Sequence, residues 1–150
     1  MNVLIATDHV YLRQSAHVYD TYCFDYGFFG DYLATFEKAD VLCRTSRPAA
    51  LPAGAFRSDG DRLEFLDVPD RRGAAWIAAS RFIASRPLRR AMADADAVVV
   101  RAPGELGWLA ARAAARLGKP YMVELIGDPK PALLSARRSL GYRVAADLWE

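Results

Sequence analysis

Polar and charged side chains follow short apolar runs at several points of this sequence, and they are the residues that could do chemistry. In chain order they are Asp8 and His9, Arg44, Arg101 and Glu105, and finally Asp128. Arginine binds anionic groups through paired N–H donors, and a carboxylate or imidazole can orient a hydroxyl group or take up its proton. These positions are therefore where a functional site is to be sought.

Glu124 differs from these residues because it lies inside an apolar run, Tyr121-Met-Val-Glu-Leu-Ile126. A carboxylate that is buried in an apolar strand needs a partner or a functional role. The position favours a functional role for Glu124.

Four other candidates each have a purely structural alternative. Asp128 precedes Pro129, where it can form an Asx turn. Arg44 can form a surface ion pair, and Glu105 can stabilise the N-terminus of the helix that it opens. Trp108 can pack in the core or against a helix instead of supporting a ligand ring. The sequence alone leaves these alternatives open.

Several common catalytic motifs are absent from the sequence. Gly27 with Gly30, and Gly104 with Gly107, have the wrong spacing for a dinucleotide fingerprint, and no Walker loop, G-x-S-x-G or H-E-x-x-H occurs. The two histidines and Cys23 do not match zinc-ligand spacing. We therefore expect neither a dinucleotide enzyme nor a metal site.

The elements that must position these residues alternate along the chain. Apolar runs predict strands at residues 3–6, 41–44, 62–68, 97–100 and 121–126. Periodic apolar stripes predict helices at 28–38, from 74, from a Ser85 cap and Pro87 first turn to about 93, at 106–117 with a stop at Gly118, and at 133–150. Alternating strands and helices predict an α/β domain with a mostly parallel sheet, whose ligands bind at the carboxyl ends of the strands.

Composition limits the class of protein. The 150 residues suffice for one domain, and the net charge of +2 is too small to indicate a nucleic-acid partner. Two cysteines suggest a reducing compartment. We see no signal peptide and no apolar stretch of about 20 residues, as a membrane span would need. A cytoplasmic location is expected, with a peripheral contact at the inner face of the membrane as a further option.

Residues 95–131 resemble the family-4 retaining glycosyltransferases. The resemblance is carried by the order of Asp96-Ala-Val-Val-Val-Arg101-Ala-Pro103-Gly104-Glu105, Gly118-Lys-Pro-Tyr121 and Val123-Glu-Leu-Ile-Gly-Asp-Pro129. It is closest to a bacterial polysaccharide-type subgroup, which the segments from Tyr26 to Phe36 and from Val41 to Arg44 also resemble.

This resemblance implies the N-terminal, acceptor-side half of a GT-B fold over residues 1–150, a Rossmann-like three-layer domain without the C-terminal donor domain. That absent domain would bind most of the nucleotide-sugar donor, and no other cofactor is implied. Ile126 stands where many members have a histidine. The implied catalytic residues are therefore Glu124 and Asp128. The implied substrate-binding residues are Asp8, His9, Tyr11, Tyr26, Arg44, Arg101, Glu105 and Gly127.

The expected partners are a glycan or lipid-linked acceptor and a donor domain in the same or another chain, with no nucleic acid. The isolated chain is predicted to be inactive. Two alternatives remain open: a stand-alone Rossmann-like binding or partner domain without catalysis, and an α/β enzyme acting on a small phosphorylated metabolite.

Overall fold

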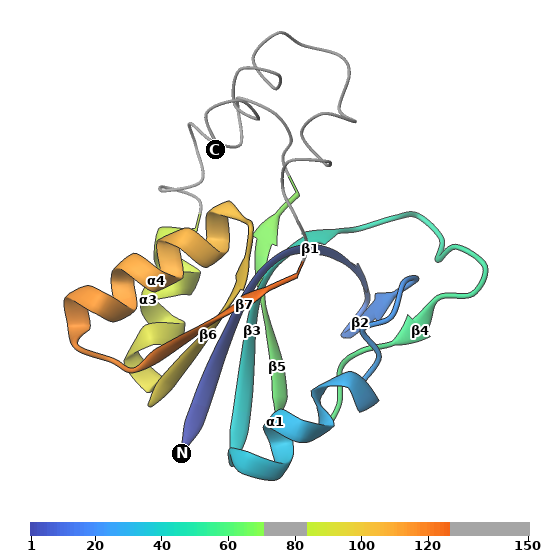
Figure 1. The fold of residues 1–150 in the computed structure, drawn as a ribbon. Helices are drawn as coiled ribbons and strands as arrows, with labels where there is room; N and C mark the ends of the chain where they lie inside the picture. Colours follow the sequence, from blue (N-terminus) through green and yellow to red (C-terminus); the bar gives the residue numbers. More distant parts are fainter. Residues whose placement is uncertain (71–83, 127–150) are drawn as a thin grey trace, which may run out of the picture.

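The computed structural model describes residues 1–70 and 84–126, which form a mixed α/β domain with one seven-stranded sheet (Figure 1). The strands are β1 (Asn2–Gln14), β2 (His17–Asp20), β3 (Lys38–Ser46), β4 (Phe56–Arg57), β5 (Leu63–Pro69), β6 (Ala97–Ala102) and β7 (Tyr121–Leu125). The helices of this part are the 3-10 turn η1 (Gly27–Phe29) and the α-helices α1 (Gly30–Thr35), α3 (Ser85–Asp94) and α4 (Glu105–Leu117).

All five strands that the sequence predicts lie in the parallel part of the sheet, in the order β5–β3–β1–β6–β7. The chain adds β3 and then β5 on one side of β1, and afterwards β6 and β7 on the other. The direction of strand addition therefore reverses between β1 and β6. At such a reversal the carboxyl ends of two neighbouring strands lead to loops that diverge, and ligands commonly bind there.

Helices pack on both faces of the sheet because residues of the central strand alternate between two cores. Val3 and Ile5 belong to a cluster with Phe29 and Leu33 of η1 and α1. Leu4 and Ala6 belong to a second cluster, formed with residues of α3 and α4. Figure 1 shows α3 and α4 beside each other, apart from α1. The parallel strands are thus the middle of three layers.

The first strand is longer than the sequence pattern predicts. β1 continues past Ala6 to Gln14, with an irregular register between Ala6 and Val10. Its last residues form an antiparallel hairpin with β2, and β2 pairs in turn with β4. The polar residues Asp8 and His9 therefore lie in the irregular middle of a long strand instead of in a loop after a short one.

Two helix boundaries also differ from prediction. α1 ends at Thr35, not at residue 38, because Lys38 begins β3, where Ala39 is buried and its N–H donates to the Arg62 carbonyl. Ala84 is the N-cap of α3 and Ser85 is its first helical residue, so the predicted cap at Ser85 is wrong by one residue. Pro87 lies in the first turn, as predicted.

α4 agrees with prediction. It runs from Glu105 to Leu117 and ends at Gly118 in the left-handed conformation, with φ +65°. The helices predicted from residue 74 and over 133–150 lie outside the described residues, apart from the end of the first. In the part of the chain that the structure describes, every helix is too short or too polar to cross a bilayer.

Candidate functional site

The strand register places Arg101 of β6 directly beside Glu124 of β7. Arg101 Nε donates to Glu124 Oε2 at 3.1 Å. Arg101 is only 8% exposed, whereas the Glu124 side chain keeps 27% of its surface in contact with solvent. Because a buried guanidinium needs a counter-charge, this pairing explains how both residues are accommodated in an apolar sheet.

Tyr32 of α1 is the second hydrogen-bond partner of Glu124. Its hydroxyl donates to Glu124 Oε1 at 2.5 Å, so the two carboxylate oxygens of Glu124 each accept a hydrogen bond from a different element. Burial raises the pKa of the Tyr32 phenol, and the hydrogen bond to Glu124 raises it further. Tyr32 therefore remains protonated and acts as a hydrogen-bond donor.

Aromatic rings surround the guanidinium of Arg101. Its Cζ lies 4.8 Å from the centroid of Phe24 and 5.0 Å from that of Phe28. A pocket of about 380 Å³ opens here, lined by Phe28, Asp31, Tyr32, Arg101 and Glu124. We call it the polar pocket. Within residues 1–70 and 84–126, the Nη groups of Arg101 have no hydrogen-bond partner, so these donors remain available to a ligand.

His9 contacts the same Phe24 ring in an edge-to-face arrangement, with the two ring centroids 4.6 Å apart. Its Nε2 and Oδ1 of Asp20 are 2.8 Å apart. Asp20 is almost fully buried, and its other oxygen accepts hydrogen bonds from the backbone N–H groups of Cys23 and Phe24. Asp20 is thus fixed in place and orients the imidazole of His9, leaving Nδ1 without a hydrogen-bond partner among the described residues.

The pKa of Asp20 reflects these contacts. Burial raises the pKa, but the hydrogen bonds from Phe24 N–H and His9 outweigh it, so the net shift is downward. Asp20 is therefore a carboxylate at neutral pH. A carboxylate on one imidazole nitrogen stabilises a proton taken up on the other, which is how an Asp–His pair serves as a general base.

Asp8 lies apart from these residues, at the N-terminus of α4. Its Oδ2 accepts a hydrogen bond of 2.8 Å from the backbone N–H of Leu106. A Cβ added at Gly104 would clash with the same carboxylate, so the present position of Asp8 depends on glycine at this site. The start of a helix attracts anions. Here the protein's own Asp8 carboxylate occupies that position.

Burial raises the pKa of Asp8, more than the hydrogen bond from Leu106 and the charge of Arg44 lower it. Arg44 in turn forms an ion pair with Asp70, and Glu105 is the first residue of α4. Arg44 and Asp70 are each half-buried. The arrangement brings Asp8, Arg44 and Glu105 to one region of the carboxyl edge of the sheet, as the sequence predicts.

Two aromatic residues that were predicted to bind substrate pack against other parts of the protein instead. Tyr11 is 1% exposed and its ring packs edge-on against Phe65 at 4.9 Å, so it belongs to the core. Tyr26 lies against Gly60 and donates its hydroxyl to the carbonyl of Asp61. Neither ring lines the polar pocket.

Trp108 lies on α4, where the guanidinium of Arg112 stacks on its ring at 4.5 Å. It does not line the polar pocket either. Gly127 and Asp128 lie outside the described residues, so the structure says nothing about their predicted roles.

Sequence reasoning missed three side chains that shape the site: Asp20, Phe24 and Tyr32. Tyr32 fits the apolar stripe of the predicted helix, but a tyrosine in such a stripe carries a hydroxyl that needs a partner when it is buried. That requirement was the available signal. Asp20 and Phe24 lie in a segment without a periodic pattern, where the sequence offered none.

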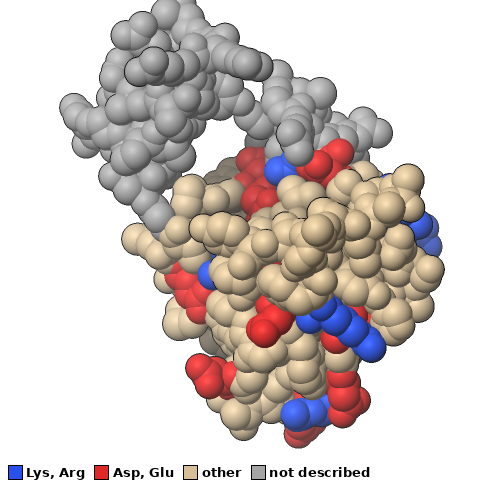
Figure 2. Space-filling view, turned by 90° about the vertical axis from the view of Figure 1, so that its right-hand side faces the viewer, with Lys and Arg blue, Asp and Glu red and all other residues tan. Residues whose placement is uncertain are grey.

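Among the described residues, no cluster of three or more His, Cys, Asp or Glu side chains could hold a metal ion. Basic and acidic side chains are interspersed on the face seen in Figure 2, which corresponds to the right-hand side of Figure 1. The described residues form no extended surface of one sign on that face.

No protein family model matches the chain, and no curated protein or solved structure shows significant similarity to it. Arguments about function therefore depend on the chemistry of the side chains. The polar pocket offers free N–H donors, a carboxylate and an aromatic wall. The His9–Asp20 pair, which contacts the Phe24 ring that Arg101 also contacts, offers a proton acceptor.

Proposed function

We propose that this chain is the acceptor-binding half of a nucleotide-sugar-dependent glycosyltransferase, with a Rossmann-like domain of the GT-B type. The parallel strand order β5–β3–β1–β6–β7 supports the fold, because it matches the order of doubly wound domains, in which the direction reverses beside the first strand. The resemblance of residues 95–131 to family-4 enzymes supports the reaction.

The polar pocket is the observation that carries the proposal. Sugars present hydroxyl groups that both donate and accept hydrogen bonds, and an apolar ring face. The free Nη groups of Arg101 can donate to two neighbouring hydroxyls, while Glu124 can accept from a third. Phe28 offers an apolar wall. This combination suits a polyhydroxylated ring better than an isolated anion, since Glu124 and Asp31 also line the pocket.

His9 is the proton acceptor in this proposal. The acceptor hydroxyl oxygen forms a bond to the anomeric carbon of the donor sugar, the bond from that carbon to the nucleoside diphosphate breaks, and the hydroxyl proton passes to His9 Nδ1. Glu124 is a binding residue in this proposal, because each of its oxygens already accepts a hydrogen bond, Oε1 from Tyr32 and Oε2 from Arg101.

The diphosphate of the donor belongs to another domain in this proposal. The N-terminus of α4 would be the natural phosphate site of the present chain, but the Asp8 carboxylate accepts the N–H of Leu106 there. A phosphate would have to displace this charge and would be repelled by it. The chain alone should therefore bind acceptor sugars and fail to transfer sugar from a nucleotide donor.

Saturation-transfer NMR with a panel of methyl glycosides tests the proposal. We expect at least one hexose glycoside to bind, and Arg101→Gln to weaken that binding by at least tenfold through the lost charged hydrogen bonds. Arg116→Gln is the matched control, because Arg116 is exposed on α4 and does not line the polar pocket. Sugar binding that survives Arg101→Gln contradicts the assigned site.

A second arm of the experiment measures turnover. Sugar transfer by the isolated chain, at a rate comparable to that of a two-domain enzyme, would show that the donor site lies within these 150 residues. In that case the proposal of an acceptor-binding half is wrong.

A further inference from the structure

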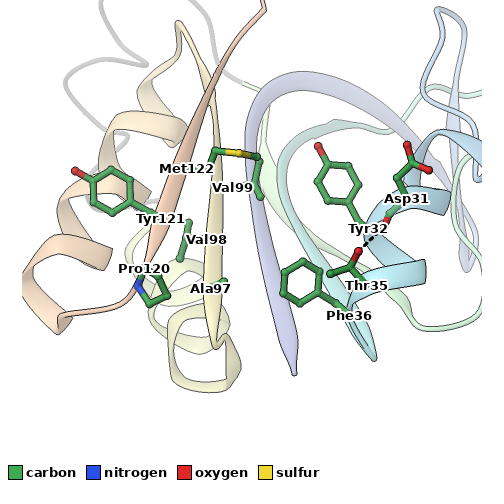
Figure 3. A pocket seen from close by; sticks show the side chains of 10 residues that line it. All are labelled: Asp31, Tyr32, Thr35, Phe36, Ala97, Val98, Val99, Pro120, Tyr121 and Met122. Atoms are coloured by element: carbon green, nitrogen blue, oxygen red, sulfur yellow. Dashed lines mark hydrogen bonds between the residues drawn. The ribbon is translucent and has the colours of Figure 1, made fainter.

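An apolar groove of about 480 Å³ lies on the same face of the sheet as α1. One wall is formed by α1 and the residue after it, with Tyr32 and Phe36, and the other by the first residues of β6 and β7, with Val99 and Met122 (Figure 3). The volume is within the usual range for small-molecule sites. The binding of a sugar in the polar pocket does not explain this second, apolar groove.

The groove and the polar pocket are consecutive rows of one sheet face. Val99 pairs with Met122 in the β6–β7 register, and two residues further along both strands Arg101 pairs with Glu124. Because side chains alternate across a sheet, residues two apart point to the same side. The floor of this face therefore changes from apolar to charged over a single step of two residues, toward the carboxyl ends of the strands.

The groove and the polar pocket also share a wall. Asp31 and Tyr32 line both, so a molecule in the polar pocket is adjacent to the groove at Tyr32. The hydroxyl of Tyr32 belongs to the polar side, through its hydrogen bond to Glu124. Its ring belongs to the apolar side (Figure 3).

The apolar wall is unusually accessible. Met122, whose side chain lies on this face beside Val99, is 53% exposed. α1 has only six residues and packs against β3, and among the described residues no other helix covers β6 and β7 on this face. Accessible apolar side chains that extend from a polar pocket fit a ligand with an apolar part joined to a polar part.

We propose that the groove holds the apolar chain of an amphiphilic acceptor, a lipid-linked sugar, whose sugar head occupies the polar pocket beside Arg101 and Glu124. This inference rests on the proposed function and deepens it, because it selects a lipid-linked acceptor over a soluble glycan. The sugar supplies the hydroxyl that reacts, and the chain in the groove fixes the orientation of the sugar.

Two glycosides that differ only in the alkyl group test this inference: methyl β-D-glucopyranoside and n-octyl β-D-glucopyranoside, the latter kept below its critical micelle concentration. A fully buried methylene strengthens binding by about fourfold, so partial burial of the octyl chain should strengthen it by at least about tenfold. Chemical-shift titration of the whole chain measures both affinities under the same conditions. Octyl sulfonate, with the same chain and no sugar, is the third probe.

Variants assign the two parts of the ligand to the two parts of the face. Met122→Glu places a charge in the groove, and it should reduce octyl glucoside affinity to that of methyl glucoside. Leu125→Glu is the matched control, since Leu125 is 80% exposed on the same strand and does not line the groove. Arg101→Gln should weaken both glucosides by the same factor and leave the preference for the octyl chain unchanged.

The outcomes separate this inference from the proposed function. Equal affinity for the two glucosides, or an octyl preference that survives Met122→Glu, overturns the groove assignment and leaves sugar binding intact. Equal binding of octyl sulfonate and octyl glucoside overturns the sugar site as well. If sedimentation shows a dimer that Met122→Glu dissociates, a second copy of the chain fills the groove and the inference is wrong.

Discussion

Tyr32→Phe removes a single hydroxyl from the polar pocket and leaves the ring in place. The lost contact is the hydrogen bond of 2.5 Å to Glu124 Oε1. Hydrogen bonds to charged groups contribute about 1.5–3 kcal/mol. Since Glu124 is 27% exposed, water can replace part of this contact, and we expect a loss of about 1–2 kcal/mol in the free energy of unfolding.

Urea unfolding followed by circular dichroism measures this loss directly, and thermal unfolding provides a second measure. For a chain of this size, each kcal/mol lowers the melting temperature by roughly 2–4 °C. Tyr22→Phe is the matched control, because Tyr22 is 79% exposed and its hydroxyl has no hydrogen bond to the described residues. It should leave stability unchanged.

A double-mutant cycle with Glu124→Gln isolates the contact between the two side chains. We expect a coupling energy of about 1 kcal/mol, because the two residues touch. The reasoning is refuted if Tyr32→Phe is indistinguishable from Tyr22→Phe, or if its effect and that of Glu124→Gln simply add. Either result would mean that the carboxylate and the phenol do not depend on one another.

Three further substitutions or conditions follow from the same contacts. Gly104→Ala should destabilise the fold by about 1–3 kcal/mol in urea unfolding, because its Cβ would clash with the half-buried Asp8 carboxylate, whereas Gly30→Ala, with no atom within 4 Å, should not. Asp8→Asn should stabilise the protein at pH 7, because burial raises the pKa of Asp8, and the gain should vanish in urea titrations below about pH 4, where the native carboxyl is protonated in both states. Asp20 has a lowered pKa in the fold, so its contribution to stability is complete above about pH 4 and should be lost in acid unfolding as the pH falls through that lowered value.

The parallel strands could be predicted because each combines a short apolar run with polar residues at its ends. Val98, Val99 and Val100 are buried on both faces of the sheet, as such a run requires. α4 was equally clear, since an apolar stripe ends at a glycine that adopts the left-handed conformation.

The β1–β2 hairpin could not be predicted, because its turn lacks the usual residues. Gln14 pairs with His17, so only Ser15 and Ala16 form the turn. Ser15 has a φ of +55°, a conformation that normally calls for glycine or asparagine. Without that signal, and with the polar residues Thr7, Asp8 and His9 interrupting the apolar run, Val10 to Leu12 could not be recognised as a continuation of the same strand.

For the candidate site, the chemistry of single residues was informative and their grouping was not. Glu124 was expected to need a partner, and Arg101 and Tyr32 provide it. The register of β6 against β7, which brings Arg101 beside Glu124, depends on packing that no local pattern specifies. The His9–Asp20 pair depends equally on the unpredicted hairpin.

Asp8 at the start of α4 also bears on how this domain could change through evolution. The N–H of Leu106 is presented to a carboxylate that belongs to the chain itself. Replacement of Asp8 by glycine would remove that carboxylate in one mutational step and free the helix start for a phosphate. Whether this edge of the sheet can accept an anionic ligand thus depends on one side chain. A single substitution would be enough to open the start of α4 to the phosphate of a nucleotide.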